Sequence, residues 1–331
     1  MEELVSRLCS DECAGRKPGT KGGLLARSIV REALEHLGFA VREQPIPTIG
    51  GANLVAELPG SGKNAERAIV VGAHYDHLGQ DGQRIYRGAD DNAAAVAILF
   101  EAARKVARAF TGGRRIVFVA FDAEESPYFR SGDMGSEVFA QETGVSHVDA
   151  MIAMDLVGHA IGREGLPDPV RKSLFVLGAE KGGLGGFIRS REGLFLRRLD
   201  AEVIPPLSDY DAYWRRRAPF LFLTCGRSSV YHTPEDTPER LDWGKMRATA
   251  DFLAELVLDL GQNAPPARYK DERDDAATVE SIIEVATALA PFAPQAGMAV
   301  RLAEGLRGRV LGEDERRALA MIVAGLEEGL A

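Results

Sequence analysis

The chain has 331 residues, of which 45% are hydrophobic, so it can bury a large core. Its formal net charge of -9 disfavours binding to a phosphate backbone, which needs a basic surface, and we expect no nucleic-acid partner. The sequence has no run of about 18 apolar residues, so we expect no membrane span, and its three cysteines are too few for a disulfide framework.

The first part of the chain alternates between helical and extended patterns. Residues 1–23 are polar and contain four glycines, which predicts a short helix followed by a loop. Residues 24–37 have apolar side chains at helical spacing, and Gly38 follows where helices commonly end. Strands are expected over 39–44, 53–58 and 68–73, and a long helix over 93–109.

The alternation continues up to about residue 260. Further buried strands are expected over 115–121, 148–154, 173–177 and 220–224, and a helix over 243–260. Strands alternating with helices predict an α/β fold with a mixed, mainly parallel central sheet and helices on both faces.

The composition changes at the Pro-containing linker 264–268. Amphipathic helices are expected beyond it, over 274–289, 296–306 and 313–330. We therefore divide the chain into a main domain, residues 1–263, and an all-helical C-terminal extension, residues 264–331. The extension is expected to pack on the main domain or on a second subunit, with control of substrate access as the alternative.

Side chains that bind metals follow several of the predicted strands. The apolar run 68–73 ends in His74, and Asp76 follows two residues later. Because loops at the carboxyl ends of neighbouring strands lie side by side, further candidates can converge on His74. These candidates are Asp90, Glu124, Glu125, Asp155 and His232. Imidazole and carboxylate groups are good ligands for zinc.

This set of side chains suits two divalent cations. Two-metal hydrolases hold the ions about 3.5–4 Å apart and bridge them with a carboxylate and a water molecule. Each ion would then have three protein ligands: one histidine, one carboxylate of its own and one Asp shared with the other ion. Of the adjacent Glu124 and Glu125, one can bind a metal while the other acts as a base. Asp76 can accept the remaining ring N–H of His74 and fix its tautomer.

Five motifs in this order resemble the di-zinc aminopeptidases of metallopeptidase clan MH. This group holds bacterial leucyl aminopeptidases and, as relatives, glutamate carboxypeptidases and glutaminyl cyclases. The motifs are His74-x-Asp76, Gly88-Ala-Asp-Asp-Asn92, Glu124-Glu125, Met154-Asp155 and His232-Thr-Pro-x-Asp-Thr237. Gly135-Ser136, Ser208-Asp209 and the segment 11–20 are also similar to family features. The resemblance covers about residues 3–260.

The resemblance implies two zinc ions per chain and a role for each residue. The implied ligands are His74 and Asp155 for one ion, Glu125 and His232 for the other, and Asp90 as the bridge. Glu124 would be the general base, and Asp91 would be left to cap the helix that follows. The family also implies a cis peptide bond between Asp90 and Asp91.

The sequence departs from the family in two places. Residues 126–133 form a longer segment than the short Gly-rich loop usual there, and Tyr210 stands where a His often follows Ser-Asp. Tyr210 and Tyr231 could donate to a developing oxyanion, with plain packing as the alternative. His77 is expected to be structural or to support a ligand. The remaining histidines belong to no motif and are expected on the surface or in loops: His36, His147 and His159.

The function expected from these features is that of a metal-dependent exopeptidase. An aminopeptidase would hydrolyse N-terminal residues of a peptide through a metal-bridging water, with Glu124 as general base. The alternatives are a one-metal acyltransferase of the glutaminyl cyclase type and a non-catalytic binding relative. The acidic N-terminus lacks the apolar stretch of a signal peptide, so the chain as it stands is expected in the cytoplasm, although members of the family are often secreted.

Overall fold

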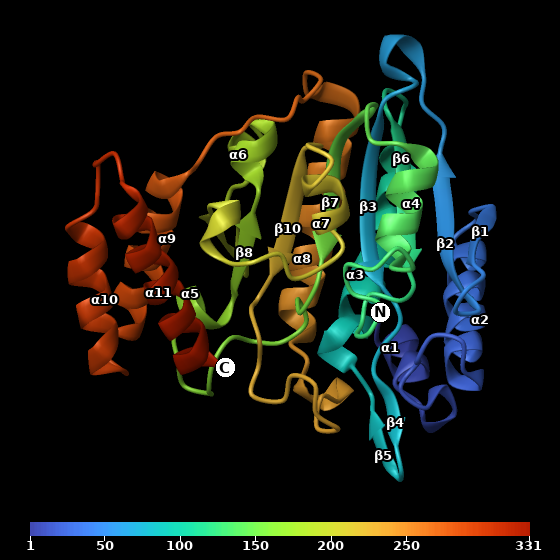
Figure 1. Cartoon of the computed structure of the whole chain (residues 1–331), viewed down its shortest axis with the longest axis horizontal. Coiled ribbons are helices and arrows are strands. Elements are labelled where there is room, and N and C mark those ends of the chain that lie inside the picture. The colour runs from blue at the N-terminus through green and yellow to red at the C-terminus, as the bar shows by residue number, and fades with distance from the viewer.

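The computed structural model describes residues 1–331 and is built around an eight-stranded sheet (Figure 1). In spatial order the strands are β1 (Val41–Ile46), β2 (Gly51–Leu58), β6 (Arg115–Phe121), β3 (Ala68–His74), β7 (Val148–Met154), β10 (Phe220–Thr224), β8 (Ser173–Leu177) and β9 (Phe195–Leu199). The pairs β6–β3, β3–β7, β7–β10 and β8–β9 are parallel, and the other three are antiparallel. The mixed, mainly parallel α/β sheet expected from the sequence is confirmed.

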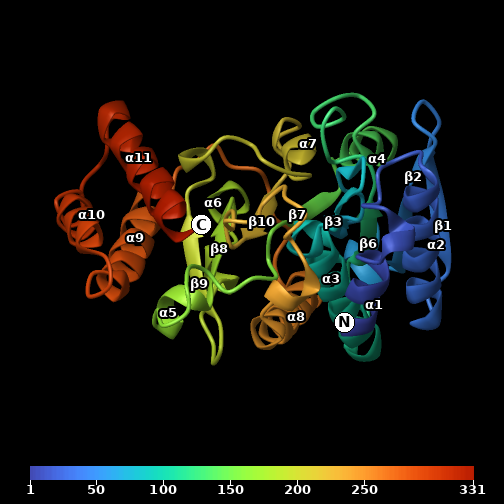
Figure 2. The same ribbon diagram turned by 90° about the horizontal axis from the view of Figure 1, so that it is seen from below.

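Helices cover both faces of this sheet (Figure 2). One face packs against α1 (Glu2–Leu8), α2 (Lys21–His36), α3 (Ala94–Ala109) and α8 (Trp243–Leu258). The other face packs against α4 (Gly135–Thr143) and α7 (Asp211–Trp214). Because successive strand residues point to opposite faces, Ile69 and Val71 belong to the first core and Val70 to the second. Burial on both sides explains why β3 reads as one continuous apolar run.

Most of the expected elements are present, with their ends shifted by a few residues. Strand β9, the hairpin of β4 (Gly79–Asp81) and β5 (Arg84–Tyr86), and α4 were not expected from the sequence. Strand β9 contains Arg197 and Arg198 side by side, so it lacks the unbroken apolar run of the central strands. It lies at the end of the sheet, where such residues can reach polar partners.

The start of α3 differs from expectation. We expected Asp91 to cap this helix, but α3 begins after Ala93 and no side chain caps it. Residues 89–93 form a separate turn before the helix. The carboxylate of Asp91 points instead toward the histidines at the end of β3, as described below.

The C-terminal extension packs against the main domain at the β9 end of the sheet (Figure 2). It consists of α9 (Asp275–Leu289), α10 (Pro294–Glu304) and α11 (Glu313–Leu330), and the short helices α5 (Asp168–Arg171) and α6 (Ala179–Gly182) lie near it. The Arg273 guanidinium donates to both oxygens of Asp200 at 2.9 and 3.0 Å. The chain contains no helix with the length and apolar character needed to cross a bilayer.

Candidate metal centre

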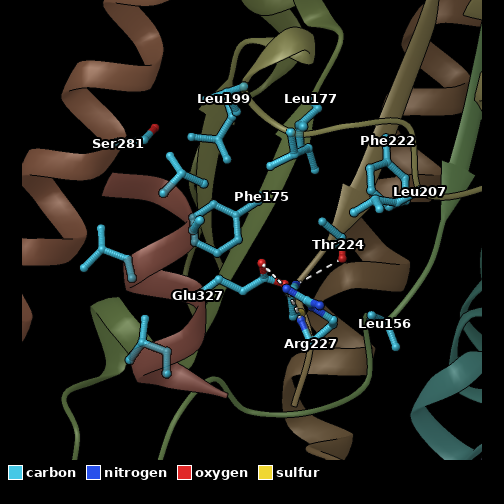
Figure 3. A pocket seen from close by; sticks show the side chains of 18 of the residues that line it. Leu156, Phe175, Leu177, Leu199, Leu207, Phe222, Thr224, Arg227, Ser281 and Glu327 are labelled. Carbon is cyan, nitrogen blue, oxygen red and sulfur yellow. Dashed lines mark hydrogen bonds and ion pairs between the residues drawn. The ribbon is translucent and has the colours of Figure 1, made fainter. Parts of the chain in front are cut away.

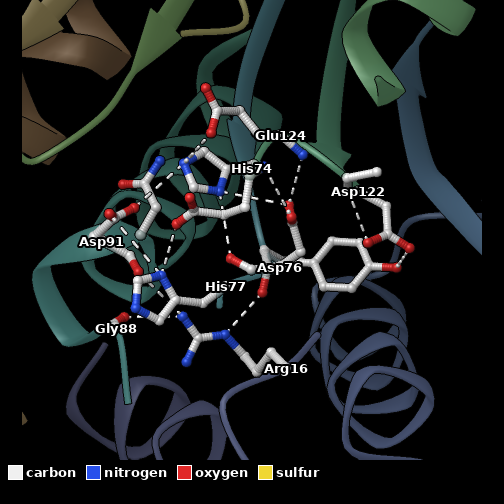
Figure 4. Close-up of polar contacts among 12 residues, drawn as sticks. Arg16, His74, Asp76, His77, Gly88, Asp91, Asp122 and Glu124 are labelled. Carbon is white, nitrogen blue, oxygen red and sulfur yellow. Dashed lines mark hydrogen bonds and ion pairs between the residues drawn. The ribbon is translucent and has the colours of Figure 1, made fainter. Parts of the chain in front are cut away.

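The polar side chains singled out in the sequence lie at or follow the carboxyl ends of β3, β6, β7 and β10. Figure 4 shows His74, Asp76 and Glu124 of this group side by side. His74 is the last residue of β3, Glu124 and Glu125 follow β6, and Asp155 follows β7. His232 lies in the loop after β10. These strands run parallel to one another, so their ends meet at one edge of the sheet.

The first half of the site forms around His74, whose side chain is fully buried. Its Nε2 atom lies 3.5 Å from Asp91 Oδ1 and 3.5 Å from Asp155 Oδ1. The other ring nitrogen, Nδ1, faces Asp76, at 3.3 Å from the backbone oxygen and 3.5 Å from Oδ1. Asp76 therefore orients the imidazole through its backbone oxygen, whereas the sequence suggested its carboxylate for this contact.

The second half of the site forms around the other oxygen of Asp91. His232 Nε2 lies 3.1 Å from Asp91 Oδ2 and 3.3 Å from Glu125 Oε2. His77 Nδ1 lies 2.8 Å from Glu125 Oε1, so His77 holds this carboxylate from behind. The two halves share Asp91, which offers one oxygen to each.

The donor atoms are arranged as a metal site requires. The Nε2 atoms of His74 and His232 are buried and have no hydrogen-bond partner, although each faces two carboxylates. In a tetrahedral zinc site with bonds of about 2.0–2.1 Å, neighbouring ligand atoms lie about 3.3 Å apart. The measured separations of 3.1–3.5 Å match this spacing, so the residues fit a cation in each half.

Asp90 does not bridge the two halves, and the expectation that it would is wrong by one residue. Its Oδ1 accepts hydrogen bonds from the backbone N–H groups of Gly158 and His159 at 2.7 and 3.1 Å. Its Oδ2 lies 2.7 Å from His159 Nδ1. Burial alone would raise the pKa of Asp90, but the neighbouring His159 outweighs it and lowers the pKa. Neighbouring side chains of the turn point in opposite directions, so Asp91 takes the bridging position.

The cis peptide bond is likewise displaced by one residue, and joins Asp91 to Asn92. The Asn92 side chain donates from Nδ2 to the backbone oxygen of Met154 at 2.8 Å. His159, which we expected on the surface or in a loop, is buried beside Asp90. A histidine close after Asp155 was the available signal for this contact, but it belongs to no motif.

Two further carboxylates hold the backbone of the ligand segments. Asp76 accepts hydrogen bonds from the N–H groups of Glu124 and Glu125 at 3.1 and 3.2 Å. Asp236 does the same for the N–H groups of Asp90 and Asp91, at 2.9 and 3.1 Å. The sequence reading gave Asp236 no role, although it lies within the motif that begins at His232.

Arg16 is a third support that the sequence reading missed. Its buried guanidinium donates to the backbone oxygens of Tyr75, Leu8 and Gly88 at 2.8, 3.0 and 2.9 Å. It thereby ties the N-terminal segment to the residues that flank the metal ligands (Figure 4). The only sequence signal was its place in the segment 11–20.

The carboxylates of the site differ in their affinity for protons. Burial raises the pKa of Glu124 well above its ordinary value; the positive charge on His74 opposes this, and the negative charge on Asp155 adds to it. Burial and the charge of Glu125 raise the pKa of Asp91 to about 7. Burial would also raise the pKa of Glu125, but its contacts with His232 and His77 lower it. Glu124 lies 3.8 Å from His74 Nε2 and is the residue best suited to hold a proton.

The two tyrosines have different surroundings. Tyr210 is buried and stacks on Phe222, and its hydroxyl contacts Leu207 N at 3.2 Å, so it serves packing rather than an oxyanion. Tyr231 is half-buried, and its ring stacks on the ring of His232 with 3.8 Å between centroids. Tyr231 therefore borders the metal centre.

Comparison with known proteins gives one family match. Residues 53–257 match the Peptidase family M28. A protein of Escherichia coli (strain K12), described as the uncharacterized protein YfbL, is 32% identical over 260 residues, which cover 70% of this chain and 78% of that protein.

Two other comparisons are more distant. A probable zinc metalloprotease of Pyrenophora tritici-repentis is 34% identical over 141 residues, which cover 41% of this chain and 31% of that protein. The crystal structure of the Legionella pneumophila LapA aminopeptidase superposes with a TM-score of 0.64 at 18% identity, over 80% of this chain and 73% of that one. This likeness shows a common fold.

Proposed function

This chain belongs to peptidase family M28, and from that premise we propose that it is a zinc-dependent aminopeptidase with two zinc ions per chain. The proposal depends above all on one observation. Asp91 lies between two buried histidine nitrogens that have no hydrogen-bond partner, one facing each of its oxygens. A bridging carboxylate between two such groups is the arrangement of two-metal hydrolases.

The residues that would hold the ions follow from the distances. His74 and Asp155 would bind one ion, Glu125 and His232 the other, and Asp91 both. When bound, zinc polarises a carbonyl group and lowers the pKa of water toward about 7. The name of the fungal relative, a probable zinc metalloprotease, supports zinc as the metal.

Glu124 would move the proton. Its side chain is buried beside His74 and is not needed as a ligand, because Glu125 already supplies a carboxylate to the second group. Glu124 would accept a proton from the attacking water and pass it to the leaving amine of the peptide. Asp76 holds its backbone in place through the hydrogen bond from the Glu124 N–H.

The nature of the ligand set supports a substrate with a free amine. The carboxylates of Asp91, Asp155 and Glu125 would offset most of the charge of two zinc ions, and an amine nitrogen is a good further donor for zinc. An α-amine held there positions the first peptide carbonyl for attack, which gives aminopeptidase action. Cyclisation of an N-terminal glutamine is the competing acyl-transfer reaction, and it would use the same amine position.

The test is a Glu124→Gln variant with Glu66→Gln as its control, because Glu66 is exposed and makes no ion pair. We expect Glu124→Gln to lower kcat on aminoacyl-nitroanilides by about 100-fold to 10,000-fold. Zinc content, measured by atomic absorption, should remain at two ions per chain in both variants. Retained activity in Glu124→Gln would refute the assignment of the base. If the wild type holds one ion per chain and turns over only peptides with an N-terminal Gln, the cyclase is favoured.

A further inference from the structure

We propose that the C-terminal extension forms the outer wall of the substrate pocket, and that α11 thereby makes the enzyme select a bulky apolar side chain at the N-terminal residue. This inference rests on the proposed function and names its substrate class. It concerns a segment that lies outside the family match, which ends at residue 257.

The observation behind it is a cavity of about 560 Å³ beside the metal centre (Figure 3). Asp155 and Tyr231 line the cavity, and both also border the ligand groups. A substrate whose carbonyl lies at the centre can therefore extend its side chain into the cavity. Of the 26 lining residues 19 are hydrophobic, so the side chain that the cavity accepts is apolar.

The cavity has two walls that come from different parts of the chain. Strands β8 and β10 of the main domain contribute Phe175, Leu177 and Phe222. Helix α9 contributes Ser281, Ile282 and Val285, and α11 contributes seven of the 26 lining residues. Without α9 and α11 the apolar side chains of the sheet would face solvent.

The residues of α11 that line the cavity recur at helical spacing. One face of the helix carries Ala320, Val323, Ala324, Glu327 and Leu330. Met321 and Leu326 lie at the two margins of this face and also line the cavity. Because Ala320 and Ala324 have small side chains, the cavity stays wide next to α11. The opposite face of the helix is exposed, as at Gly325, where a side chain would meet nothing within 4 Å.

An ion pair fixes α11 to the loop that carries a metal ligand. Glu327 Oε1 accepts hydrogen bonds from the backbone N–H and the Nε of Arg227 at 3.1 and 3.0 Å, and Oε2 accepts one from Nη2 at 3.1 Å (Figure 3). Arg227 lies between β10 and His232 in the chain. The paired charges of Arg227 and Glu327 neutralise each other at the cavity wall, which leaves the interior suited to an apolar group.

The size of the cavity sets the preferred side chain. A volume of about 560 Å³ falls within the range of about 300–1,000 Å³ typical of pockets that enclose whole small ligands. Alanine would leave most of it unfilled, whereas phenylalanine buries a large apolar surface there. One methylene group in such a pocket changes kcat/KM by about 10-fold or more, so the difference between Phe and Ala should be at least about 100-fold.

The experiment compares kcat/KM for Phe-, Leu- and Ala-nitroanilides in the wild type and two tryptophan variants. Ala324→Trp places a large side chain on the cavity face, and Gly325→Trp places the same side chain on the outer face as a control. We expect wild type to prefer Phe over Leu over Ala. The ratio of kcat/KM for Phe to that for Ala should fall at least about 10-fold in Ala324→Trp and stay unchanged in Gly325→Trp.

A binding measurement separates this inference from the proposed function. Isothermal titration should show that wild type binds L-phenylalaninol, which has no amide bond to cleave, at least about 10-fold more tightly than L-alaninol, and that Ala324→Trp loses this difference. Equal hydrolysis of Phe and Ala substrates by wild type, or an unchanged ratio in Ala324→Trp, overturns the role of α11. Absence of hydrolysis with all three substrates, while selective binding and its loss in Ala324→Trp persist, overturns the proposed activity and supports the pocket wall.

Discussion

The carboxylate of Asp236 holds the backbone of Asp91, whose N–H donates to Asp236 Oδ2 at 3.1 Å. The other oxygen of Asp236 accepts from the N–H of Asp90 at 2.9 Å. One buried anion therefore fixes two successive residues of the turn, and with them the direction in which the Asp91 side chain points. Asp76 holds Glu124 and Glu125 in the same way from the opposite side.

We predict that Asp236→Asn weakens zinc binding by about 10-fold to 100-fold, as losing a partner that orients ligands typically does. Asparagine keeps one acceptor oxygen but turns its amide N–H₂ toward the second backbone N–H, so one hydrogen bond is lost. Zinc affinity is measured by competition with a chromophoric chelator. Asp81→Asn, at an exposed position of the β4–β5 hairpin, is the control. An unchanged affinity in Asp236→Asn would show that the turn keeps its shape without this anion.

We predict that Arg16→Lys lowers the free energy of unfolding by about 2–4 kcal/mol. The guanidinium of Arg16 reaches backbone oxygens in three separate segments, and the single ammonium of a lysine cannot replace contacts that diverge in this way. Urea denaturation of the two proteins gives the difference. Arg84→Lys, on the exposed hairpin, should leave stability within about 0.5 kcal/mol of wild type. A loss equal to that of the control would contradict the role of Arg16 as a tie between segments.

We predict that Glu180 makes the protein less stable as the pH rises. Burial raises its pKa from 4.5 to about 7; the hydrogen bond from the Ala201 N–H opposes this shift, and Asp200 adds to it. The folded state therefore binds this proton more tightly than the unfolded state. The resulting stabilisation is complete below about pH 4.5, is lost as the pH rises to about 7, and amounts to about 3 kcal/mol.

Glu180→Gln removes the ionisation and keeps an acceptor for the Ala201 N–H. Relative to wild type, the variant should gain up to about 3 kcal/mol in unfolding free energy between pH 5 and pH 8. Urea denaturation at the two pH values measures this gain. The matching change at exposed Glu192 should show no gain. Parallel pH profiles for wild type and Glu180→Gln would refute the prediction.

The sheet and most of the ligand set could be predicted because each apolar run that predicts a strand is followed directly by a side chain that can bind a metal. A buried parallel strand must be apolar throughout, so the point where polarity returns, as at His74, marks a strand end. The choice between Asp90 and Asp91 could not be made this way, because adjacent side chains in a turn point in directions that depend on their partners. The partners of Asp90 are Gly158 and His159, which lie far away in the sequence.

Arg16, Asp236 and β9 were missed for a related reason. Arg16 donates only to backbone oxygens. Because every residue has a backbone oxygen, no pattern of side chains in the sequence predicts these contacts. Asp236 likewise binds backbone N–H groups. Strand β9 becomes recognisable only with its neighbours present, because α9 covers a strand whose own sequence contains two arginines. The role of residues 264–331 was open from the sequence for the same reason.

The two edges of the sheet are closed to further strands by different means. At one edge, hydroxyl groups of α9 occupy the free backbone groups next to β9: Ser281 donates to the oxygen of Arg198 at 2.8 Å, and Thr278 accepts from the N–H of Asp200 at 2.8 Å. At the other edge, β1 carries charged side chains and Pro45, which offers no N–H to a partner. The C-terminal extension thus also prevents aggregation through the β9 edge of the sheet, and this role does not depend on which peptide the enzyme cleaves.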